Sequence, residues 1–232
     1  MLGAVLLNAS VRAAELNIVT ENFPNFQYLN EQGQLQGKAA ELVLKVLEAS
    51  KIDHQISVMN WSLAYNAALR DDNTCLFSIA RLDTRESQFT WVFPVAVFSA
   101  SFYALESANI TLSRLDDALQ YKTAVIRNNF SHQYLLERGF DEERHLILIT
   151  NFDNVFDLLA TRSDLLDLVI LSDAQYEYRL AKGEIKVPLQ RLWTLEAGRT
   201  ELYFACNKNI AKPLFNRLLQ AYQQVSNTVK PL

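Results

Sequence analysis

Two consecutive series of alternating strand-like and helix-like segments constrain the fold of this 232-residue chain more than any other feature. In the first series, the strand patterns at Leu16–Thr20, 56–59 and 75–79 alternate with helical apolar spacing at 39–47 and 61–69. Strands that alternate with helices form mostly parallel sheets covered by helices, because parallel neighbours need a long crossover connection. The pattern therefore predicts an α/β fold.

A second series of the same kind follows a stretch rich in aromatic residues. Strand patterns at Thr123–Ile126, Leu146–Ile149 and 166–171 alternate with helical patterns around residues 134–136 and 154–161. No flexible Gly/Ser-rich or Pro-rich linker separates the two series. We therefore expect two lobes in contact, and an interface between lobes is a favoured location for a ligand cleft.

Local signals predict where three helices begin. Ser113 followed three residues later by Asp116 is a capping-box pattern, and Ser131 can cap the helix that follows it. Pro213 stands in the first turn of a segment with apolar residues at 214, 215, 218, 219, 222 and 225. This spacing predicts an amphipathic helix of about four turns near the carboxyl end of the chain.

Composition excludes several classes of function. The formal net charge is -4, the sequence pI is about 5.5, and no run of Lys or Arg exceeds two residues, so a nucleic-acid footprint is absent. The six glycines match neither a GxGxxG nor a Walker-type phosphate loop. The three histidines share no metal-ligand spacing and no Cys/His cluster occurs, so we predict neither a metal nor a cofactor.

Residues 1–14 look like the remnant of a secretory leader. A short apolar run covers residues 2–9, and residues 11–13 offer a small-residue cleavage pattern. A buried first strand is the alternative. Export predicts a soluble, monomeric protein of the periplasm, where an oxidising environment permits a bond between Cys75 and Cys206. Two buried free thiols are the alternative to that bond.

Candidate binding residues follow from the strand ends. In open α/β sheets, ligands bind beyond the carboxyl ends of the strands. Ser78 and Arg81 lie there in the first series, and residues 127–130, Ser172 and Asp173 lie there in the second. Asp173 is also a suitable helix N-cap.

Arg81 and Arg85 precede a strand with alternating Phe89, Trp91 and Phe93. The rigid fork of an arginine binds a carboxylate through two hydrogen bonds, which lysine cannot match. These arginines therefore predict an anion site, although Arg81 can instead pair with Asp83 or Glu86. We expect Trp61 and the alternating aromatics to belong to the core.

The order of three segments resembles that of the family 3 solute-binding proteins, the exported receptors of amino-acid ABC importers. The segments are LNIVTENFPNFQYLNEQGQLQGKAAELV, FSIARLDTRESQFTWVFP and LLATRSDLLDLVILSD. The likeness covers nearly the whole chain from Glu15. It implies two α/β lobes that are joined by two strand-like hinge crossings and close on the ligand.

The resemblance also implies how the chain divides. The first lobe is expected to hold residues 15–97 plus 198–232, and the second lobe residues 98–197. The family's returning strand, here at 202–206, runs antiparallel beside the strand at 75–79. That arrangement would bring the two cysteines together at the base of the first lobe, away from the ligand.

The same resemblance assigns roles in the cleft. Arg85 matches the arginine that grips the carboxylate of the ligand, and Phe23 matches the aromatic that covers its side chain. Ser78 falls where backbone and hydroxyl groups bind the ligand. Asn129 or Phe130 matches the loop of the second lobe that contacts the carboxylate.

The sequence departs from the family pattern at two positions. Leu82 stands where a hydroxyl residue is expected, and Ser172 stands where an acid should pair with the ammonium group of the ligand, with Asp173 one residue further on. A carboxylate-bearing ligand is therefore a safer expectation than a plain α-amino acid.

The function that these features predict is capture of a small carboxylate, such as an amino acid, and its delivery to the membrane permease of an ABC importer. One alternative is an enzyme on the same fold, similar to the cyclohexadienyl dehydratases. Such an enzyme needs a cleft acid of raised pKa, and no residue of the sequence demands that role. A second alternative is a ligand-sensing module of a receptor kinase.

Overall fold

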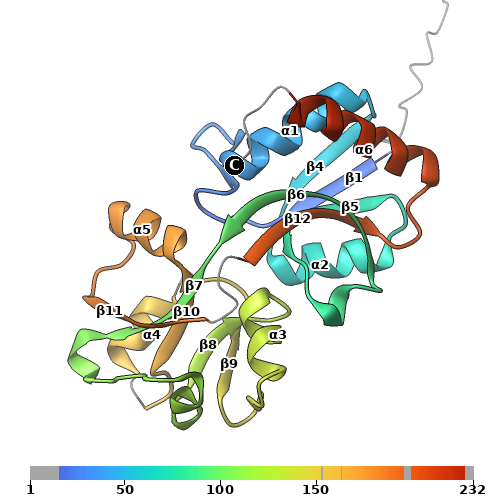
Figure 1. The fold of residues 1–232 in the computed structure, drawn as a ribbon. Helices are drawn as coiled ribbons and strands as arrows, with labels where there is room; N and C mark the ends of the chain where they lie inside the picture. The colour runs from blue at the N-terminus through green and yellow to red at the C-terminus, as the bar shows by residue number, and fades with distance from the viewer. Residues whose placement is uncertain (1–15, 153, 163, 196–199, 228–232) are drawn as a thin grey trace, which may run out of the picture.

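The computed structural model describes residues 16–152, 154–162, 164–195 and 200–227, so the predicted leader at 1–14 lies outside the described residues. The described chain forms two lobes, each built on a five-stranded sheet with helices packed against it (Figure 1). The predicted two-lobed α/β fold is confirmed. The exact division of the chain between the lobes stays a prediction.

The first sheet has the strand order β4-β1-β5-β12-β6. The bounds of its strands are β1 (Leu16–Thr20), β4 (His54–Val58), β5 (Thr74–Ala80), β6 (Phe89–Phe98) and β12 (Thr200–Asn207). β1 pairs in parallel with β4 and β5, whereas β12 pairs antiparallel with both β5 and β6. Four strands therefore run in one direction, and β12 alone runs in the other.

Helices cover both faces of the first sheet. They are α1 (Lys38–Ser50), α2 (Trp61–Arg70) and α6 (Lys212–Ser226). α1 and α6 lie together on one face and α2 lies on the other (Figure 1). The loop between β1 and α1 carries the short antiparallel pair β2 (Tyr28–Leu29) and β3 (Leu35–Gln36).

The second sheet has the order β11-β7-β10-β8-β9. Its strands are β7 (Ala100–Leu105), β8 (Thr123–Ile126), β9 (Leu146–Ile149), β10 (Leu168–Ser172) and β11 (Leu189–Thr194). Its helices are α3 (Phe130–Leu136), α4 (Val155–Thr161) and α5 (Asp173–Ala181). Three short 3₁₀ helices complete the described structure: η1 (Asp83–Arg85), η2 (Glu106–Ala108) and η3 (Leu115–Gln120).

The chain crosses from each lobe to the other, and these crossings explain the reversed strand in each sheet. β6 leaves the first lobe and continues past Ser99 into β7 of the second lobe (Figure 1). The carboxyl ends of the parallel strands in both sheets face the space between the lobes. A strand that arrives from the other lobe therefore enters at the carboxyl edge and runs antiparallel to its neighbours, as β7 and β12 do.

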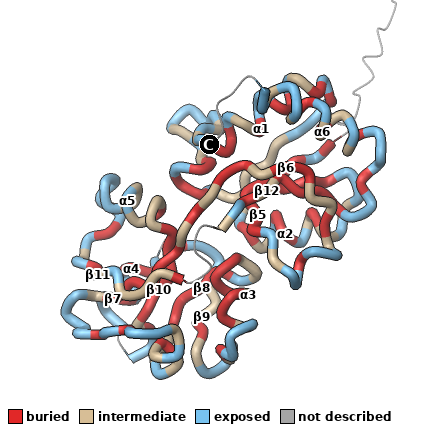
Figure 2. The backbone as a smooth tube through the Cα atoms, viewed as in Figure 1, coloured by how far each residue is buried: buried red, intermediate tan, exposed pale blue. Residues whose placement is uncertain are grey.

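Burial follows the predicted patterns closely. The buried residues of α2 are Trp61, Ala64, Tyr65 and Ala68, the face that the helical spacing predicted. All seven residues of β5 are buried, as expected for a central strand that is covered on both faces (Figure 2). α6 buries Leu214 and Leu218, as its apolar spacing predicted, and also Ala221, which the predicted positions did not include.

Cys75 and Cys206 lie opposite each other in the register of β5 and β12 and are joined by a disulfide bond. Cys75 is near the start of β5, and the carboxyl end of that strand faces the other lobe. The bond therefore ties the base of the first lobe, away from the space between the lobes.

Two predicted helix caps are wrong in detail. The acid near η3 that accepts hydrogen bonds from the N–H groups of Ser113 and Arg114 is Asp117, at 2.8 and 3.1 Å, and not Asp116. α3 begins at Phe130, so Ser131 lies inside its first turn. The N-cap is Asn129, whose Oδ1 accepts from the N–H of His132 at 2.9 Å.

Candidate ligand-binding cleft

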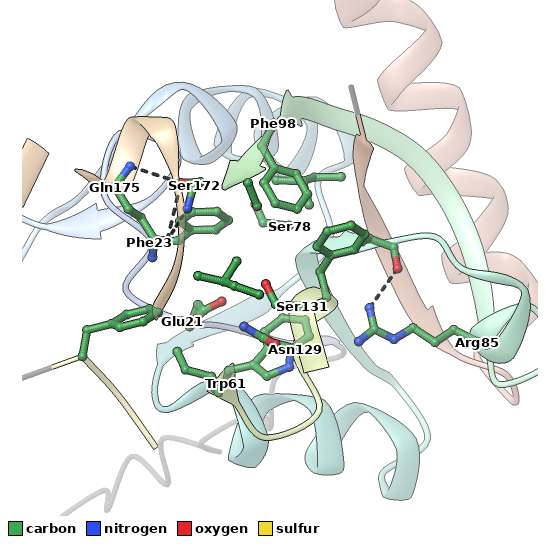
Figure 3. A pocket seen from close by; sticks show the side chains of 17 residues that line it. Glu21, Phe23, Trp61, Ser78, Arg85, Phe98, Asn129, Ser131, Ser172 and Gln175 are labelled. Carbon is green, nitrogen blue, oxygen red and sulfur yellow. Dashed lines mark hydrogen bonds between the residues drawn. The ribbon is translucent and has the colours of Figure 1, made fainter. Parts of the chain in front are cut away.

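A cavity lies between the lobes, at the carboxyl ends of the strands of both sheets (Figure 3). The side chains around it come from both lobes and include Glu21, Phe23, Trp61, Ser78, Arg85, Asn129, Phe130, Ser172 and Gln175. The cavity leaves about 40 Å³ for the centres of water molecules. Since one water needs roughly 10–15 Å³ of such space, an organic ligand enters only when the lobes separate.

Direct hydrogen bonds hold the lobes together beside this cavity. The main-chain carbonyl of Asn128 in the second lobe accepts from Trp61 Nε1 and from Arg85 Nη2, both at 2.7 Å. Ser62 Oγ donates to the carbonyl of Arg127 at 2.9 Å. The start of α2 and the end of η1 therefore dock on the turn that follows β8.

Two further contacts close the lobes away from that turn. Asn25 Nδ2 donates to the carbonyl of Ala174 at 3.0 Å, and Thr84 Oγ1 donates to Glu137 Oε1 at 3.1 Å. Side-chain contacts thus run across the interface on more than one edge of the cavity. The lobes are in a closed arrangement.

Arg85 is the predicted carboxylate-binding residue, and its side chain is only 1% exposed. Its Nη1 donates to the carbonyl of Ala80 at 3.0 Å, and its Nη2 donates to the carbonyl of Asn128. Its buried Nε has no hydrogen-bond partner among the described residues. Burial lowers the pKa of Arg85 to about 10, while Tyr65 and Glu137 act in the opposite direction.

Ser78 lies in a β-bulge at the end of β5. The register between β5 and β12 shifts at this residue, and Ser78 has the left-handed φ of 65°. Its Oγ donates to Gln27 Oε1 at 2.7 Å, and Gln27 Nε2 donates to Thr20 Oγ1 at 3.1 Å. Bulges turn side chains out of the ladder next to functional sites, at a cost of about 1–3 kcal/mol for a strained non-glycine backbone.

Aromatic rings form the wall of the cavity nearest the hinge. Phe98, the last residue of β6, makes edge-to-face contacts with Phe23 at 6.1 Å and with Phe130 at 5.2 Å between ring centroids. Phe23 comes from the first lobe and Phe130 from the second. The predicted covering aromatic therefore lies in the cavity wall, together with an aromatic residue of the crossing strand.

Asn129 and Ser172 also line the cavity, but one oxygen of each serves as a helix cap. Asn129 Oδ1 caps α3, and Ser172 Oγ accepts from the N–H of Gln175 at 3.1 Å at the start of α5. Each residue thus stands at the point where a strand of the second lobe turns into a helix beside the cavity.

Arg81, the second predicted arginine, does not line this cavity. It pairs with Glu86 through two hydrogen bonds, one of them at 2.8 Å from Nε to Oε2. Its guanidinium lies over the rings of Trp91 and Tyr203, at 5.4 and 5.6 Å from the ring centroids. The alternative interpretation, in which Arg81 pairs with a neighbouring acid, describes this structure.

Asp173 is likewise directed away from the cavity. Its carboxylate accepts hydrogen bonds from Ser99 Oγ at 2.8 Å, Ser101 Oγ at 3.1 Å and Tyr103 OH at 3.1 Å. Arg191 lies 3.4 Å from it. The N-cap of α5 is Ser172 and not Asp173. Asp173 therefore fastens the hinge crossing to α5.

Glu21 lines the cavity but is not among the predicted binding residues. Glu21 follows β1 directly and projects into the cavity (Figure 3). Burial raises the pKa of its carboxyl group to about 8, against the opposing effect of Arg179. The strand-end rule that selected Ser78 applies to Glu21 equally well, so the signal was present in the sequence.

Trp61 and Gln175 are two further cavity residues that are not among the predicted binding residues. Trp61 is buried, as predicted for a core residue, but its ring also lines the cavity and its Nε1 bonds across the interface. Gln175 lies in the first turn of α5, just past the end of β10. The cavity thus joins one guanidinium, one carboxyl group and several amide and hydroxyl groups between aromatic walls.

A scan against protein-family models and a search of curated protein sequences both find no match. Solved structures match over most of the chain. A histidine kinase sensor domain with similarity to periplasmic binding proteins aligns with a TM-score of 0.77 at 18% identity, over 92% of this chain and 91% of that chain. An ancestral arginine-binding protein bound to arginine aligns with a TM-score of 0.75 at 17% identity, over 91% and 92%.

A third match is a putative L-cystine ABC transporter protein from Listeria monocytogenes, with a TM-score of 0.75 at 15% identity, over 92% of this chain and 90% of that chain. These likenesses define the class of fold. The chain has the two-lobed fold of the periplasmic binding proteins, with its candidate site in the space between the lobes. The family 3 resemblance of the sequence predicted this fold.

Proposed function

We propose that the protein is a solute-binding protein that captures a small carboxylate ligand, in the first place an amino acid, between its lobes. The observation that carries this proposal is the guanidinium of Arg85. It is buried at a cavity, and its hydrogen-bond acceptors are neutral main-chain carbonyls. Glu137 is near enough to raise the pKa of Arg85, but no carboxylate of the described residues is hydrogen-bonded to the guanidinium. A buried charge without a directly bonded counter-charge is costly, and a ligand carboxylate would supply that partner.

Glu21 refines the class of ligand. It is the acid that lines the same cavity as Arg85, whereas the carboxylate of Asp173 is engaged at the hinge. A ligand with both a carboxylate and a cationic group matches Arg85 and Glu21 together. Amino acids have these two charges, which supports an amino acid despite the absence of an acid at Ser172.

The solved structures support the same class. One neighbour is an arginine-binding protein with arginine bound, and another is a putative cystine ABC transporter protein. As the sequence predicted, we further propose that the protein is exported to the periplasm, works there as a monomer and delivers its ligand to the permease of an ABC importer. In the described part of the chain, no helix is both long enough and apolar enough to cross a membrane.

One observation favours the enzyme alternative, and it is again Glu21. A cleft acid with a pKa of about 8 is the group that a dehydratase-like reaction requires. Against it, the neighbours described above are binding proteins and a sensor domain. Incubation with prephenate separates the enzyme from the binding protein. Release of product shows an enzyme, and prephenate that stays intact supports the binding function.

The binding function is tested by a thermal-shift screen across amino acids and small organic acids. A ligand at 100 times its Kd adds about 2.7 kcal/mol to the free energy of unfolding, which is a clear rise in Tm. Small-angle scattering with the hit then tests closure about crossings near residues 97–102 and 195–200. A screen in which no carboxylate raises the Tm contradicts the proposal.

A further inference from the structure

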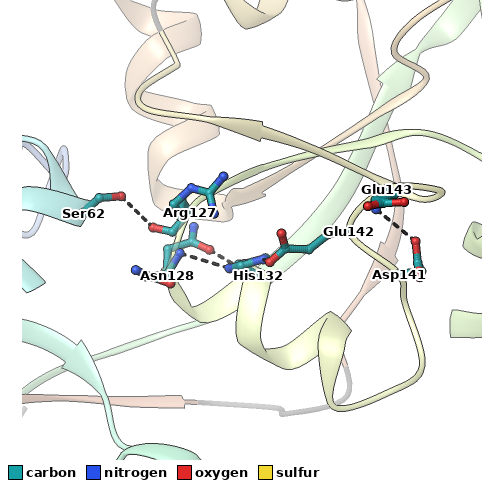
Figure 4. Close-up of polar contacts among 8 residues, drawn as sticks. Ser62, Arg127, Asn128, His132, Asp141, Glu142 and Glu143 are labelled. Carbon is teal, nitrogen blue, oxygen red and sulfur yellow. Dashed lines mark hydrogen bonds and ion pairs between the residues drawn. The ribbon is translucent and has the colours of Figure 1, made fainter. Parts of the chain in front are cut away.

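Three of the hydrogen bonds between the lobes, from Trp61, Ser62 and Arg85, end on one turn of the second lobe, residues 127–129, which connects β8 to α3 (Figure 4). Asn128 in the middle of this turn has the left-handed φ of 61°. Its carbonyl accepts the hydrogen bonds from Trp61 and Arg85 that join the lobes. The orientation of one peptide group therefore decides whether both bonds form.

His132 holds the other side of Asn128. The N–H of Asn128 donates to His132 Nδ1 at 3.0 Å, and the ring is buried, with 2% of the residue exposed. Nε2 of the same ring lies 3.0 Å from Glu142 Oε1 (Figure 4). Because a main-chain N–H is always a donor, Nδ1 is the acceptor and the ring proton is on Nε2, where it is donated to Glu142.

We propose that His132 is the positioning residue for lobe closure: its neutral ring holds the amide of Asn128 so that the carbonyl faces Trp61 and Arg85, and its protonation releases the turn. The proposal goes beyond ligand capture, because it concerns contacts that the lobes make without a ligand. It predicts that acid weakens the closed arrangement.

The reason is the loss of an acceptor. A protonated imidazole carries a hydrogen on both nitrogens, so Nδ1 can no longer accept from Asn128. Two donors then face each other in a buried site, where an unmade hydrogen bond costs about 1–3 kcal/mol. The turn then loses the hydrogen bond that holds it on the side of His132, so it relaxes and its carbonyl leaves Trp61 and Arg85.

The charges around the ring set the pH range. Glu142 faces it from the loop after α3, Arg127 from the end of β8, and Arg85 from the first lobe. Burial lowers the pKa of His132, Glu142 raises it, and the two arginines lower it. The ring is therefore neutral at pH 7, and it titrates below the ordinary histidine value of about 6.5.

The lowered pKa of His132 decides whether acid strengthens or weakens the closed arrangement. A histidine with a lowered pKa in the closed form favours that form when it is neutral. Its contribution is complete above about pH 6.5 and is lost as the pH falls through the pKa of the closed form. Closure is thus expected to be intact at pH 7.5 and to weaken progressively towards pH 5.

The indole N–H of Trp61 is a direct probe, because it donates to the carbonyl of Asn128. The chain has three tryptophans, so a ¹H–¹⁵N spectrum shows three indole signals, which single Trp→Phe variants assign. On titration of the protein without ligand, we expect the Trp61 signal to move with one midpoint and its hydrogen exchange to speed up in acid. The signals of Trp91 and Trp193 serve as internal references.

Two substitutions of His132 distinguish the acceptor role of its Nδ1 from the space that its ring fills. In His132→Asn, the amide oxygen stands near the place of Nδ1, accepts from Asn128 and does not titrate, so the Trp61 signal should stay at its closed position from pH 7.5 to 5. His132→Gln reaches Glu142 but leaves the amide of Asn128 without its acceptor, so the signal should be open-like at every pH.

Glu142→Gln keeps a hydrogen-bonding side chain and removes the charge that raises the pKa of His132, so the midpoint should fall. Glu143→Gln is the control, since Glu143 follows Glu142 in the loop after α3 but its own N–H bonds to Asp141. A Trp61 signal that ignores pH in the native protein, or that titrates with the native midpoint in His132→Asn, overturns the proposal. If His132→Asn does not fold, an unchanged midpoint in Glu142→Gln overturns it.

All of these measurements are made without ligand. A failure here therefore leaves the ligand-binding proposal untouched, and a failed ligand screen leaves this proposal untouched.

Discussion

The guanidinium of Arg85 in the first lobe and the main-chain carbonyl of Asn128 in the second lobe are joined by a hydrogen bond of 2.7 Å. The same guanidinium lines the cavity between the lobes. An arginine has five N–H donors in a rigid fork, so one side chain can bind the opposite lobe and a ligand carboxylate together. Ligand affinity and lobe closure are therefore expected to be coupled at Arg85.

Arg85→Gln should lose about 2–5 kcal/mol of ligand binding, because it removes a buried charge partner of the carboxylate. This corresponds to about 30-fold or more in Kd. Titration calorimetry with the compound found by thermal shift measures the loss. Arg81→Gln is the matched control, since Arg81 pairs with Glu86 outside the cavity and its removal should leave Kd within about twofold.

Arg85 is almost fully buried, so its substitution is also expected to lower stability. Circular dichroism should therefore confirm a folded protein at the temperature of the titration. Equal affinity in folded Arg85→Gln and in the native protein would remove Arg85 from the site.

Glu21 should make ligand binding depend on pH. Its pKa is raised to about 8, so at pH 7 most of the carboxyl groups are protonated, and a cationic ligand binds only after a proton leaves. Affinity should rise from pH 6 to about pH 8, and the heat of binding should vary with the ionisation heat of the buffer. Glu21→Gln should show neither effect, and a pH profile unchanged by this substitution rules out the role.

Glu21 should also make the stability of the protein depend on pH, but stability should fall with rising pH, whereas affinity should rise. A folded-state pKa above the unfolded value of about 4.3 means that the folded protein holds the proton more tightly. The stabilisation that this proton provides is complete below pH 4.3 and is lost as the pH rises towards 8. The Tm of Glu21→Gln relative to the native protein should therefore increase from pH 5 to pH 8, and a constant difference contradicts the assignment.

The bond between Cys75 and Cys206 closes a long loop, with a sequence separation of 131 residues. The chain-entropy model gives about 4.7 kcal/mol for a loop of roughly a hundred residues, so the Cys75→Ala/Cys206→Ala variant should unfold at clearly lower urea concentration. Ligand affinity should stay nearly constant, because the bond lies at the base of the first lobe. Alkylation of both cysteines in unfolded, unreduced protein would show that the bond is absent.

Asp173→Asn should lower the stability of the second lobe without weakening ligand binding. The carboxylate accepts from Ser99, Ser101 and Tyr103, and hydrogen bonds to a charged group contribute about 1.5–3 kcal/mol each. Urea unfolding measures the loss, and calorimetry should give a Kd close to the native value. A selective loss of affinity in a protein of native stability would return Asp173 to the ligand site.

The sequence by itself determined the fold class and much of the candidate site. The alternation of strand and helix patterns predicted the α/β fold, and helical spacing predicted the buried face of α2. The strand-end rule predicted Ser78 in the cleft, since the carboxyl ends of parallel strands gather at one edge of a sheet whatever their loops do. These predictions depend on local periodicity and on one general property of parallel sheets.

Only the tertiary structure decided which of two similar residues faces the cavity. Arg81 and Arg85 are four residues apart, but Arg81 is held outside the cavity by its neighbour Glu86 and by the rings of Trp91 and Tyr203. Tyr203 belongs to β12, which pairs with β6 only after the chain has returned from the second lobe. Asp173 is turned away from the cavity by Ser101 and Tyr103 of β7, far from it in sequence. Side-chain directions at a strand end are set by such long-range partners, and these exist only when the sheets are assembled.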